Sequence, residues 1–312
     1  MGTNDVIIRT VDLRVDYGDV RAVAGLNLEI KRGEIYGLIG PNGSGKTSTF
    51  RVLATLLEPT YGDVYIAGMD IAEQRKDVHK ILGYMPDIPV MYDDLKVWEF
   101  FDLFAGAYFV PSKERKQRVD ECLALVNLEG KRNALTSELS RGMKQRLLLG
   151  KTLLHKPSVL ILDEPAGGLD PIARVELRNV LRDLAAEGNT ILISSHILTE
   201  LEGFCTSIGI LEKGHLVADG KIDEIRDNMT TSDQLIMEVI GEKETSAQIL
   251  ANVETIHDIQ IQKESITFQF NGSLEERAAI LVYLIENNIP VIAFYEKKMN
   301  VEDISMQVGA KE

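Results

Sequence analysis

The sequence predicts an α/β core followed by a small α+β domain, and three observations lead to this prediction. Short apolar runs rich in β-branched residues occur at 35–40 (IYGLIG), 159–163 (VLILD) and 190–195 (TILISS). Such runs are typical of strands in a parallel sheet that is covered on both faces. Segments 47–57 and 172–188 have the apolar spacing of helices and can supply the crossovers that parallel strands need. The length of 312 residues exceeds that of one average domain.

Antiparallel strands are predicted before the first of these runs. From residue 5 to about 35 the sequence alternates apolar and polar residues (VIIRTVDLRVDY, LNLEI), a pattern typical of strands with one buried face. Turn signals at 17–19 (YGD) and 31–34 (KRGE) separate the strands. Between about 88 and 157 the pattern becomes helical, and we expect a helical subdomain inserted into the α/β core.

The character of the chain changes after residue 228. Three segments resemble strands (QLIMEVIG, SITFQFNG and VIAFYEKK), with two helical segments between them (SAQILANVE and EERAAILVYLIENN). This order predicts a small α+β unit. We therefore expect two domains, at residues 1–228 and 229–312.

The charge balance argues against a nucleic-acid partner. The formal net charge is −14 and the sequence pI is about 4.9, whereas nucleic-acid surfaces need clustered lysine and arginine. Residues 230–312 hold fourteen acidic and six basic side chains, so the predicted second domain is acidic too. The chain has only two cysteines, Cys122 and Cys205, and a fold of this size needs no disulfide, which favours a reducing compartment.

No targeting or membrane-spanning segment is expected. The first ten residues, MGTNDVIIRT, lack a basic stretch followed by an apolar one, so the sequence predicts no secretory signal. The most apolar stretch, WEFFDLFAGAYFV at 98–110, contains Glu99 and Asp102 and falls short of the roughly 20 residues that a bilayer core requires.

A phosphate-binding loop lies between the first predicted parallel strand and the following helix. Gly40, Gly45, Lys46 and Thr47 match G-x-x-x-x-G-K-[ST]. Glycines let backbone N–H groups converge on a phosphate, and the helix directs its positive dipole end to the same place. Lys46 is expected to reach the β and γ phosphates, and the Thr47 hydroxyl to bind Mg²⁺. The predicted nucleotide-binding residues of this loop are Gly40, Pro41, Asn42, Gly43, Ser44, Gly45, Lys46, Thr47 and Ser48.

Two adjacent carboxylates end a strand without polar residues and complete such a site. In SVLILDEP, Asp163 is expected to hold Mg²⁺ through water, and Glu164 to orient or deprotonate an attacking water. An N-K-x-D motif, the usual mark of guanine specificity, does not occur. The sequence therefore favours ATP, with a hydrolase or a kinase as the possible chemistries.

The segment LSRGMKQRLLLGKTLLHKP at 139–157 narrows the choice. Ser140 is placed to cap a helix. With this segment, residues 5 to about 225 resemble the ATP-binding subunit of an ABC transporter of the ABC-2 exporter group, whose signature is usually written LSGGQ. The resemblance implies an ABC-type P-loop ATPase core in which two subunits pack head to tail. Ser140 and Gly142 of one subunit would then contact the ATP bound by the other.

The resemblance extends to three further positions. Tyr17 corresponds to the aromatic residue that stacks on adenine, Asp170 in GGLD lies in the loop that crosses the dimer interface, and His196 in SSHIL corresponds to a histidine that contacts the γ-phosphate. We accordingly expect Glu164 and His196 to be catalytic.

Three positions depart from the family pattern. Asp87 in LGYMPD replaces the usual glutamine and is expected to contact Mg²⁺ or a water, because a carboxylate accepts hydrogen bonds but does not donate them. Arg141 replaces the first glycine of the signature and Met143 its glutamine. We expect nucleotide binding to tolerate Arg141, which would add a cation near the phosphates of the partner subunit.

The resemblance also implies partners and a location. A second copy of the chain, or a related ATPase, would complete the dimer, and a separate transmembrane permease would carry the cargo. The subunit would lie in the cytoplasm, peripheral on the inner face of the cell membrane. The stretch 91–104, with Trp98, Phe100 and Phe101, is the expected docking surface for the permease, although such aromatics are more often core.

Two other classes of function stay open from the sequence. A soluble mechanical ATPase of the same superfamily acts on ribosomes or DNA, but it usually has two cassettes or a long coiled-coil insert, and this chain shows neither. A P-loop kinase would transfer phosphate to an acceptor, but that function does not explain residues 139–146.

Overall fold

The computed structural model describes the following residues of the protein: 5–88, 91–201, 203–222, 224–225, 233–263 and 265–296. The described residues before position 223 form one compact unit, and those after it form a second. Each unit is described by itself below. The predicted boundary at 228/229 lies outside the described residues.

The N-terminal strands form an antiparallel sheet of four strands in the order β2-β1-β4-β5. Its members are β1 (Val6–Tyr17), β2 (Val20–Lys31), β4 (Tyr61–Ile66) and β5 (Met69–Asp70). In the β1–β2 hairpin Tyr17 pairs with Val20, and Gly18 supplies the positive φ of 58° that the turn requires. Buried and exposed residues alternate along β2, so the predicted antiparallel strands with one buried face are confirmed.

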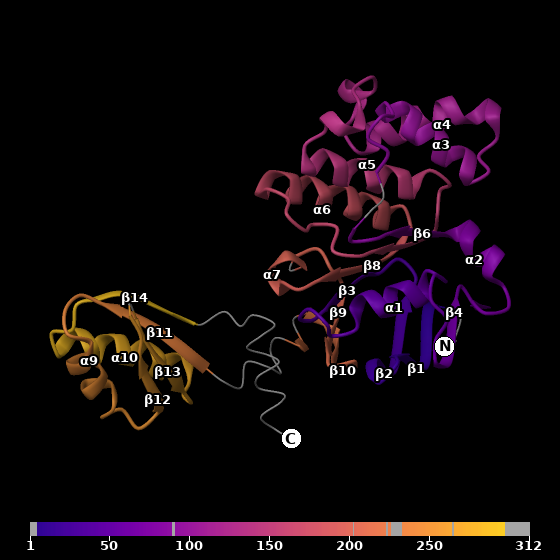
Figure 1. Ribbon diagram of the computed structural model, residues 1–312. Coiled ribbons are helices and arrows are strands. Elements are labelled where there is room, and N and C mark those ends of the chain that lie inside the picture. The colour runs from indigo at the N-terminus through magenta and orange to yellow at the C-terminus, as the bar shows by residue number, and fades with distance from the viewer. Residues whose placement is uncertain are drawn as a thin grey trace. The chain divides into compact units, whose positions relative to one another are not determined.

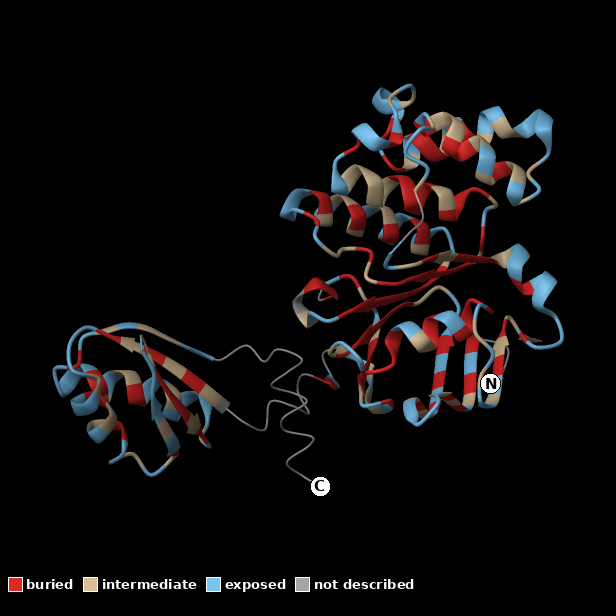
Figure 2. Cartoon of the chain, viewed as in Figure 1, coloured by how far each residue is buried: buried red, intermediate tan, exposed pale blue. Residues whose placement is uncertain are grey.

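A sheet of six strands in the order β10-β9-β3-β8-β7-β6 forms the centre of the first unit (Figure 1). Its members are β3 (Ile35–Ile39), β6 (Leu82–Met85), β7 (Val159–Leu162), β8 (Thr190–Ser195), β9 (Ser207–Glu212) and β10 (His215–Lys221). All pairs are parallel except β9–β10. Every residue of β3, β7 and β8 is buried, as the red strands of Figure 2 show. The predicted parallel sheet is therefore confirmed.

Within the described part of the first unit, the helices with defined bounds outside the helical insert are α1 (Lys46–Leu53), α2 (Arg75–Ile81), α6 (Pro171–Ala186) and α7 (Leu198–Leu201). Phe50 and Leu53 of α1 pack in one core cluster with residues of both sheets, such as Leu28 and Leu38. The α1 helix is shorter than the predicted 47–57, because Thr55 adopts a φ of 61°, which is incompatible with a helix.

In the described part of the predicted helical insert between 88 and 157 there are three α-helices. They are α3 (Val97–Ala107), α4 (Ser112–Leu125) and α5 (Arg141–Leu153), with short 3₁₀ turns at Glu129–Lys131 and Thr136–Glu138. The α3 and α5 helices pack closely at Gly150. A Cβ at this position would lie 2.7 Å from the Phe101 ring. A glycine in the interior of α5 thus permits the approach that its low helix propensity would otherwise oppose.

The aromatic cluster expected to dock a permease lies largely in the core. Phe100 and Phe101 are completely buried, and Trp98 is half-buried. They occupy the face of α3 that packs on the rest of the insert, so the prediction of an exposed cluster is wrong for these two phenylalanines. The large apolar side chains of 91–104 that do reach the surface are Tyr92 and Leu103, which are 46% and 48% exposed.

From residue 233 onward, the described residues of the second unit form a sheet of four strands in the order β12-β13-β11-β14, together with the helices α9 and α10. Its elements are β11 (Asp233–Val239), α9 (Lys243–Leu250), β12 (Ile256–Ile261), β13 (Ile266–Phe270), α10 (Leu274–Glu286) and β14 (Val291–Glu296). The predicted α+β character is confirmed, but β12 was not foreseen. Its alternation is broken by a register shift between His257 and Gln260, where Asp258 adopts a φ of 49°. Among the described residues, no helix combines the length and apolar character that crossing a bilayer requires.

Candidate functional site

The loop between β3 and α1 depends on its glycines. Gly43 and Gly45 adopt φ values of 82° and 108°, which residues with a Cβ rarely adopt. A Cβ on Gly45 would lie 2.3 Å from the carbonyl oxygen of Ala22, and one on Gly40 would lie 2.2 Å from that of Leu211. The backbone therefore passes so close to its neighbours that only glycine fits at these two positions.

Lys46 is the buried cation of this loop. Its Nζ donates hydrogen bonds to the carbonyl oxygens of Gly40 at 2.7 Å and Pro41 at 3.2 Å, and it lies 3.7 Å from Oε1 of Glu164. Burial lowers the pKa of Lys46, and the Glu164 and Asp163 carboxylates oppose that shift. The ammonium group is thus held between the loop and the carboxylates at the end of β7.

Asp163 has the environment of a metal-binding carboxylate. It is 1% exposed, and its Oδ1 accepts a hydrogen bond from the Ser194 hydroxyl at 2.7 Å, whereas Oδ2 is buried without a hydrogen-bond partner of normal geometry among the described residues. Burial raises the pKa of Asp163, the Ser194 and Thr47 hydroxyls lower it, and Asp87 raises it. A buried carboxylate oxygen without a partner beside a threonine hydroxyl fits Mg²⁺, which prefers oxygen ligands.

Glu164 and His196 meet at the ends of β7 and β8. Nδ1 of His196 lies 3.0 Å from Oε2 of Glu164, and the Glu164 backbone N–H donates to the Ser194 hydroxyl at 2.8 Å. Glu164 adopts a φ of 48°, a strained conformation that turns the chain directly after the strand. Its side chain is 14% exposed and contacts Lys46 through its other oxygen. The two residues predicted to be catalytic are therefore in direct contact.

Most of the predicted site residues surround one pocket of about 550 Å³. Its lining consists of Val20, Arg21, Ala22, Asn42, Gly43, Ser44, Gly45, Lys46, Thr47, Ser48, Asp87, Arg141, Glu164, Gly167, Gly168 and His196. Gly40 and Pro41 lie behind the lining, where their carbonyls hold Lys46. The Ser44 hydroxyl is another buried polar atom without a partner in the described structure. The loop, the Glu164 and Asp87 carboxylates and His196 thus border one pocket, whereas Asp163 is not part of its lining.

Besides Gly40 and Pro41, four of the predicted nucleotide-binding residues do not line this pocket: Tyr17, Ser140, Gly142 and Asp170. Tyr17 is 46% exposed, and its hydroxyl lies 3.4 Å from that of Ser48, next to the loop. The Asp170 carboxylate caps α6, where its Oδ1 accepts from the N–H groups of Ile172 and Ala173 at 3.0 and 2.9 Å. Contacts of these four residues with nucleotide stay predictions.

The α5 helix begins as predicted but places one side chain unexpectedly. The Ser140 hydroxyl accepts a hydrogen bond from the Met143 N–H at 3.3 Å and so caps the helix. The next residue, Arg141, lines the pocket of its own chain. A Cβ on Gly168 would lie 2.2 Å from Cζ of Arg141, so the guanidinium group covers the Gly168 backbone. Arg141 was expected to lie near the phosphates of a partner subunit. In the single chain its guanidinium group lies beside the loop that follows Glu164.

Gly168→Ala is expected to destabilise the chain by about 1–2 kcal/mol, because alanine is strained at a left-handed φ, here 69°. Gly188→Ala, at a φ of 100° in open space, is the matched control. We expect the two losses in free energy of unfolding, measured with denaturant, to agree within about 0.5 kcal/mol. The exposed Arg141 guanidinium lies at the end of a flexible side chain and can move away from the new methyl group. A much larger loss for Gly168→Ala would show that Arg141 is held firmly in place.

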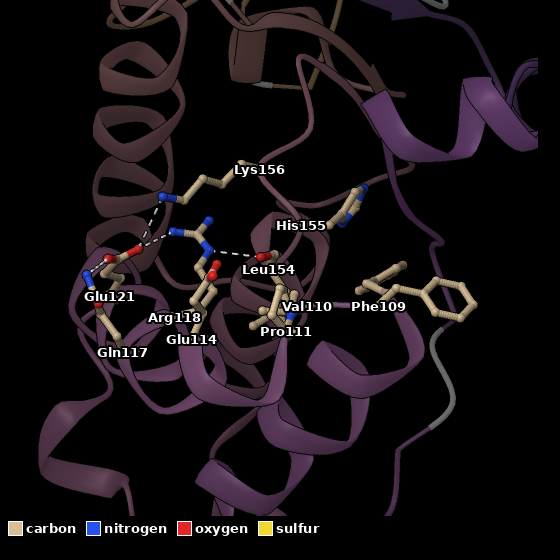
Figure 3. Close-up of a pocket in the computed structure, with 11 residues that line it drawn as sticks. Phe109, Val110, Pro111, Glu114, Gln117, Arg118, Glu121, Leu154, His155 and Lys156 are labelled. Carbon is tan, nitrogen blue, oxygen red and sulfur yellow. Dashed lines mark hydrogen bonds and ion pairs between the residues drawn. The ribbon is translucent and has the colours of Figure 1, made fainter.

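A second pocket, of about 450 Å³, lies in the helical insert away from these residues. Figure 3 shows Arg118 and Lys156 both pointing toward Glu121, with ion pairs of 2.8 and 3.7 Å. Nε of Arg118 also donates to the Leu154 carbonyl at 2.8 Å. Since its cations are already paired within the pocket, it is a poor site for a triphosphate. The pocket at the glycine-rich loop is the candidate nucleotide site.

Ser194 contacts both residues of the carboxylate pair, and the sequence pattern did not single it out. Its hydroxyl accepts from the Glu164 N–H and donates to the Asp163 carboxylate, so it orients both members of the carboxylate pair. The signal was a polar residue at the end of an otherwise apolar buried strand, TILISS, because buried hydroxyls are almost always hydrogen-bonded.

The chain has clear relatives among known proteins. The family model described as "ABC transporter" matches residues 23–167. The bacitracin transport ATP-binding protein BcrA of Bacillus licheniformis is 33% identical over 298 residues, which cover 95% of each chain. The Nod factor export ATP-binding protein I of Burkholderia orbicola is 30% identical over 321 residues, which cover 100% of this chain and 99% of that protein.

Solved structures of similar fold carry related descriptions. One described as the ATP-binding subunit of an ABC transporter is 32% identical, covers 72% of this chain and 93% of its own, and superposes with a TM-score of 0.65. The dimeric post-hydrolysis state of the cassette MJ0796 bound to ADP and Pi is 25% identical, covers 69% of this chain and 99% of its own, and gives a TM-score of 0.63.

Proposed function

This chain belongs to the ATP-binding subunits of ABC transporters, and from that premise we propose how its residues bind and hydrolyse MgATP. The observation that carries the proposal is the convergence of Lys46, Glu164 and His196 on one pocket beside the glycine-rich loop. The α1 helix begins at this loop with no acidic residue in its first turn, which suits an anion.

Different residues of this chain bind the phosphates and activate the attacking water. Backbone N–H groups of the loop and Lys46 bind the phosphates, with Lys46 exchanging its carbonyl partners for phosphate oxygens. Glu164 acts as the general base toward the attacking water, and His196 orients the Glu164 carboxylate and contacts the γ-phosphate. Thr47, Asp163 and Asp87 would hold Mg²⁺, which neutralises charge on the phosphate oxygens when bound.

A second subunit completes the site. Ser140 and Gly142 do not line the pocket of their own chain, and a capped helix start is an anion-binding end. We propose that they contact the ATP of a partner in a head-to-tail dimer, with Tyr17 stacking on adenine and Asp170 crossing the interface. The dimeric cassette structures among the neighbours support this arrangement.

The permease, the direction of transport and the location are proposed from the relatives. The names of the relatives include bacitracin transport and Nod factor export, which supports an exporter with a separate transmembrane permease. The subunit would lie on the cytoplasmic face of the membrane, and the exposed Tyr92 and Leu103 of the helical insert would contact the permease. Residues 1–228 would form the ATPase domain, and residues 229–312 an accessory domain.

Co-purification from the native host tests the transporter proposal. After solubilisation of membranes in mild detergent, we expect the tagged chain to retain a multi-span membrane protein that mass spectrometry identifies. A Tyr92→Ser, Leu103→Ser double variant is expected to retain less of it, whereas Phe109→Ser, which changes an exposed aromatic residue outside 91–104, is the matched control. Recovery of ribosomal or DNA-repair proteins instead, with the chain absent from membranes, would overturn the transport proposal.

A further inference from the structure

Glu200 is a buried carboxylate that the proposed mechanism leaves without a role. It lies on α7 and is 7% exposed, and both of its oxygens have partners. Oε2 accepts from the Ser195 hydroxyl at 2.8 Å, and Oε1 lies 3.1 Å from Nη1 of Arg174. A buried charge is costly unless it is paired and hydrogen-bonded, so the position of Glu200 is defined by these two partners.

One partner controls the segment that contains His196. The Ser195 hydroxyl accepts the N–H of Ile197 at 3.0 Å while it donates to Glu200. The two neighbours of His196 are thus tied together, and the tie is anchored on the carboxylate. The His196 side chain is 49% exposed, and its Nδ1 lies 3.0 Å from Oε2 of Glu164. The direction of the ring therefore depends on that contact and on the backbone of this turn.

The other partner controls the loop that follows Glu164. Arg174 lies on α6, and its Nε donates to the carbonyl oxygen of Leu169 at 3.0 Å. Leu169 is 5% exposed and follows Gly167 and Gly168, which line the nucleotide pocket. The guanidinium group therefore joins the end of this loop to Glu200.

Glu200 and both of its partners stand outside the pocket. None of Ser195, Arg174 and Glu200 lines it, and the Glu200 backbone carbonyl is held from α6 by Nη2 of Arg178 at 2.7 Å. Loss of the Glu200 charge would thus leave the glycine-rich loop and Lys46 unchanged. It would release the two segments that flank Glu164, the turn around His196 and the loop at 167–169.

We propose that Glu200 is a positioning residue that couples the His196 turn to the 167–169 loop and so keeps His196 aligned on Glu164 during hydrolysis. This inference rests on the proposed function, because it needs Glu164 to be the base. A purely structural role, in which Glu200 only docks α7, would instead lower stability without acting through His196.

Glu200→Gln separates these roles, since glutamine keeps the size and a hydrogen-bond acceptor for Ser195 but loses the charge that pairs with Arg174. In the full-length chain we expect kcat for ATP hydrolysis to fall about tenfold, and the ATP affinity and KM to change less than about twofold. Glu34→Gln is the matched control. That half-buried carboxylate accepts from the Lys31 N–H and the Ser207 hydroxyl at the start of β3, and we expect no change in kcat.

The decisive measurement is a double-mutant cycle with His196→Ala, followed by single-turnover hydrolysis. If Glu200 acts through His196, Glu200→Gln has no further effect on the rate in the His196→Ala background. The positioning role is overturned if the fold-losses in rate of Glu200→Gln and His196→Ala multiply in the double variant. It is also overturned if the ATP affinity of Glu200→Gln falls together with its kcat. Arg174→Lys, which retains the charge, serves as the second variant if Glu200→Gln does not fold, and the same loss of additivity is expected. A wild-type chain that binds no ATP would refute the proposed function instead.

Discussion

Glu164→Gln is expected to lower the rate of ATP hydrolysis by about 100- to 10,000-fold, the usual contribution of a general base, while ATP binding persists. The carboxylate lies 3.0 Å from His196 and 3.7 Å from Lys46. Glutamine keeps the shape of the side chain but cannot accept a proton from water. Because the loop that binds phosphate is unchanged, ATP should accumulate at the site and hold the head-to-tail dimer closed.

The measurement combines phosphate release with size-exclusion chromatography in the presence of MgATP. A dimer peak for Glu164→Gln, with a predominantly monomeric wild type once ATP is consumed, is the expected result. Glu187→Gln, on an exposed residue after α6, is the matched control and should hydrolyse normally. Normal turnover by Glu164→Gln would exclude Glu164 as the base. If Glu164→Gln failed to bind ATP, Glu164 would instead be a residue that binds the nucleotide.

Lys46→Ala is expected to weaken ATP binding by about 10- to 100-fold, since one hydrogen bond to a charged group contributes about 1.5–3 kcal/mol. Lys46 is 5% exposed, and its ammonium group donates to the carbonyls of Gly40 and Pro41. Its removal also leaves the Glu164 carboxylate without its lysine partner beside the phosphates. The loss should be smaller for ADP than for ATP, because the γ-phosphate is the group nearest to Glu164 in the proposed mechanism.

Titration calorimetry with ATP and ADP measures this difference directly. Lys31→Ala changes an exposed lysine at the end of β2 and is expected to leave both affinities unchanged. Urea unfolding without nucleotide shows whether Lys46→Ala is folded. Equal ATP affinity in a folded Lys46→Ala variant would refute the assignment of this loop to the triphosphate.

The glycine-rich loop and the carboxylates were predictable because their chemistry is local in the chain. A strand, the loop Gly40 to Thr47 and a helix follow one another directly in the sequence. This order alone brings converging N–H groups and a lysine together, whatever the rest of the fold is. Likewise Asp163 and Glu164 follow directly on a buried strand. By contrast, β12 escaped prediction, since Asp258 interrupts the alternation that marks a strand.

Contacts between distant segments were decided by the tertiary structure alone. As aromatic residues close together, Phe100 and Phe101 suggest a docking surface in the sequence. Only the packing of α3 against α5 shows that they are buried in the core. The roles of Ser194 and Glu200 depend on the parallel pairing of β7 with β8 and on the approach of α6 to α7. These residues act through partners about 30 positions away.

The sequence by itself determined the family and predicted the nucleotide loop and the base, because each depends on residue types at fixed short spacing. The tertiary structure decided which polar groups orient that base and which apolar groups reach the surface. The physical reason is that hydrogen bonds and burial are properties of neighbours in space. The contact between His196 and Glu164 depends on both the sequence and the fold. Each residue was predicted separately from the sequence, and only the fold brings the two together.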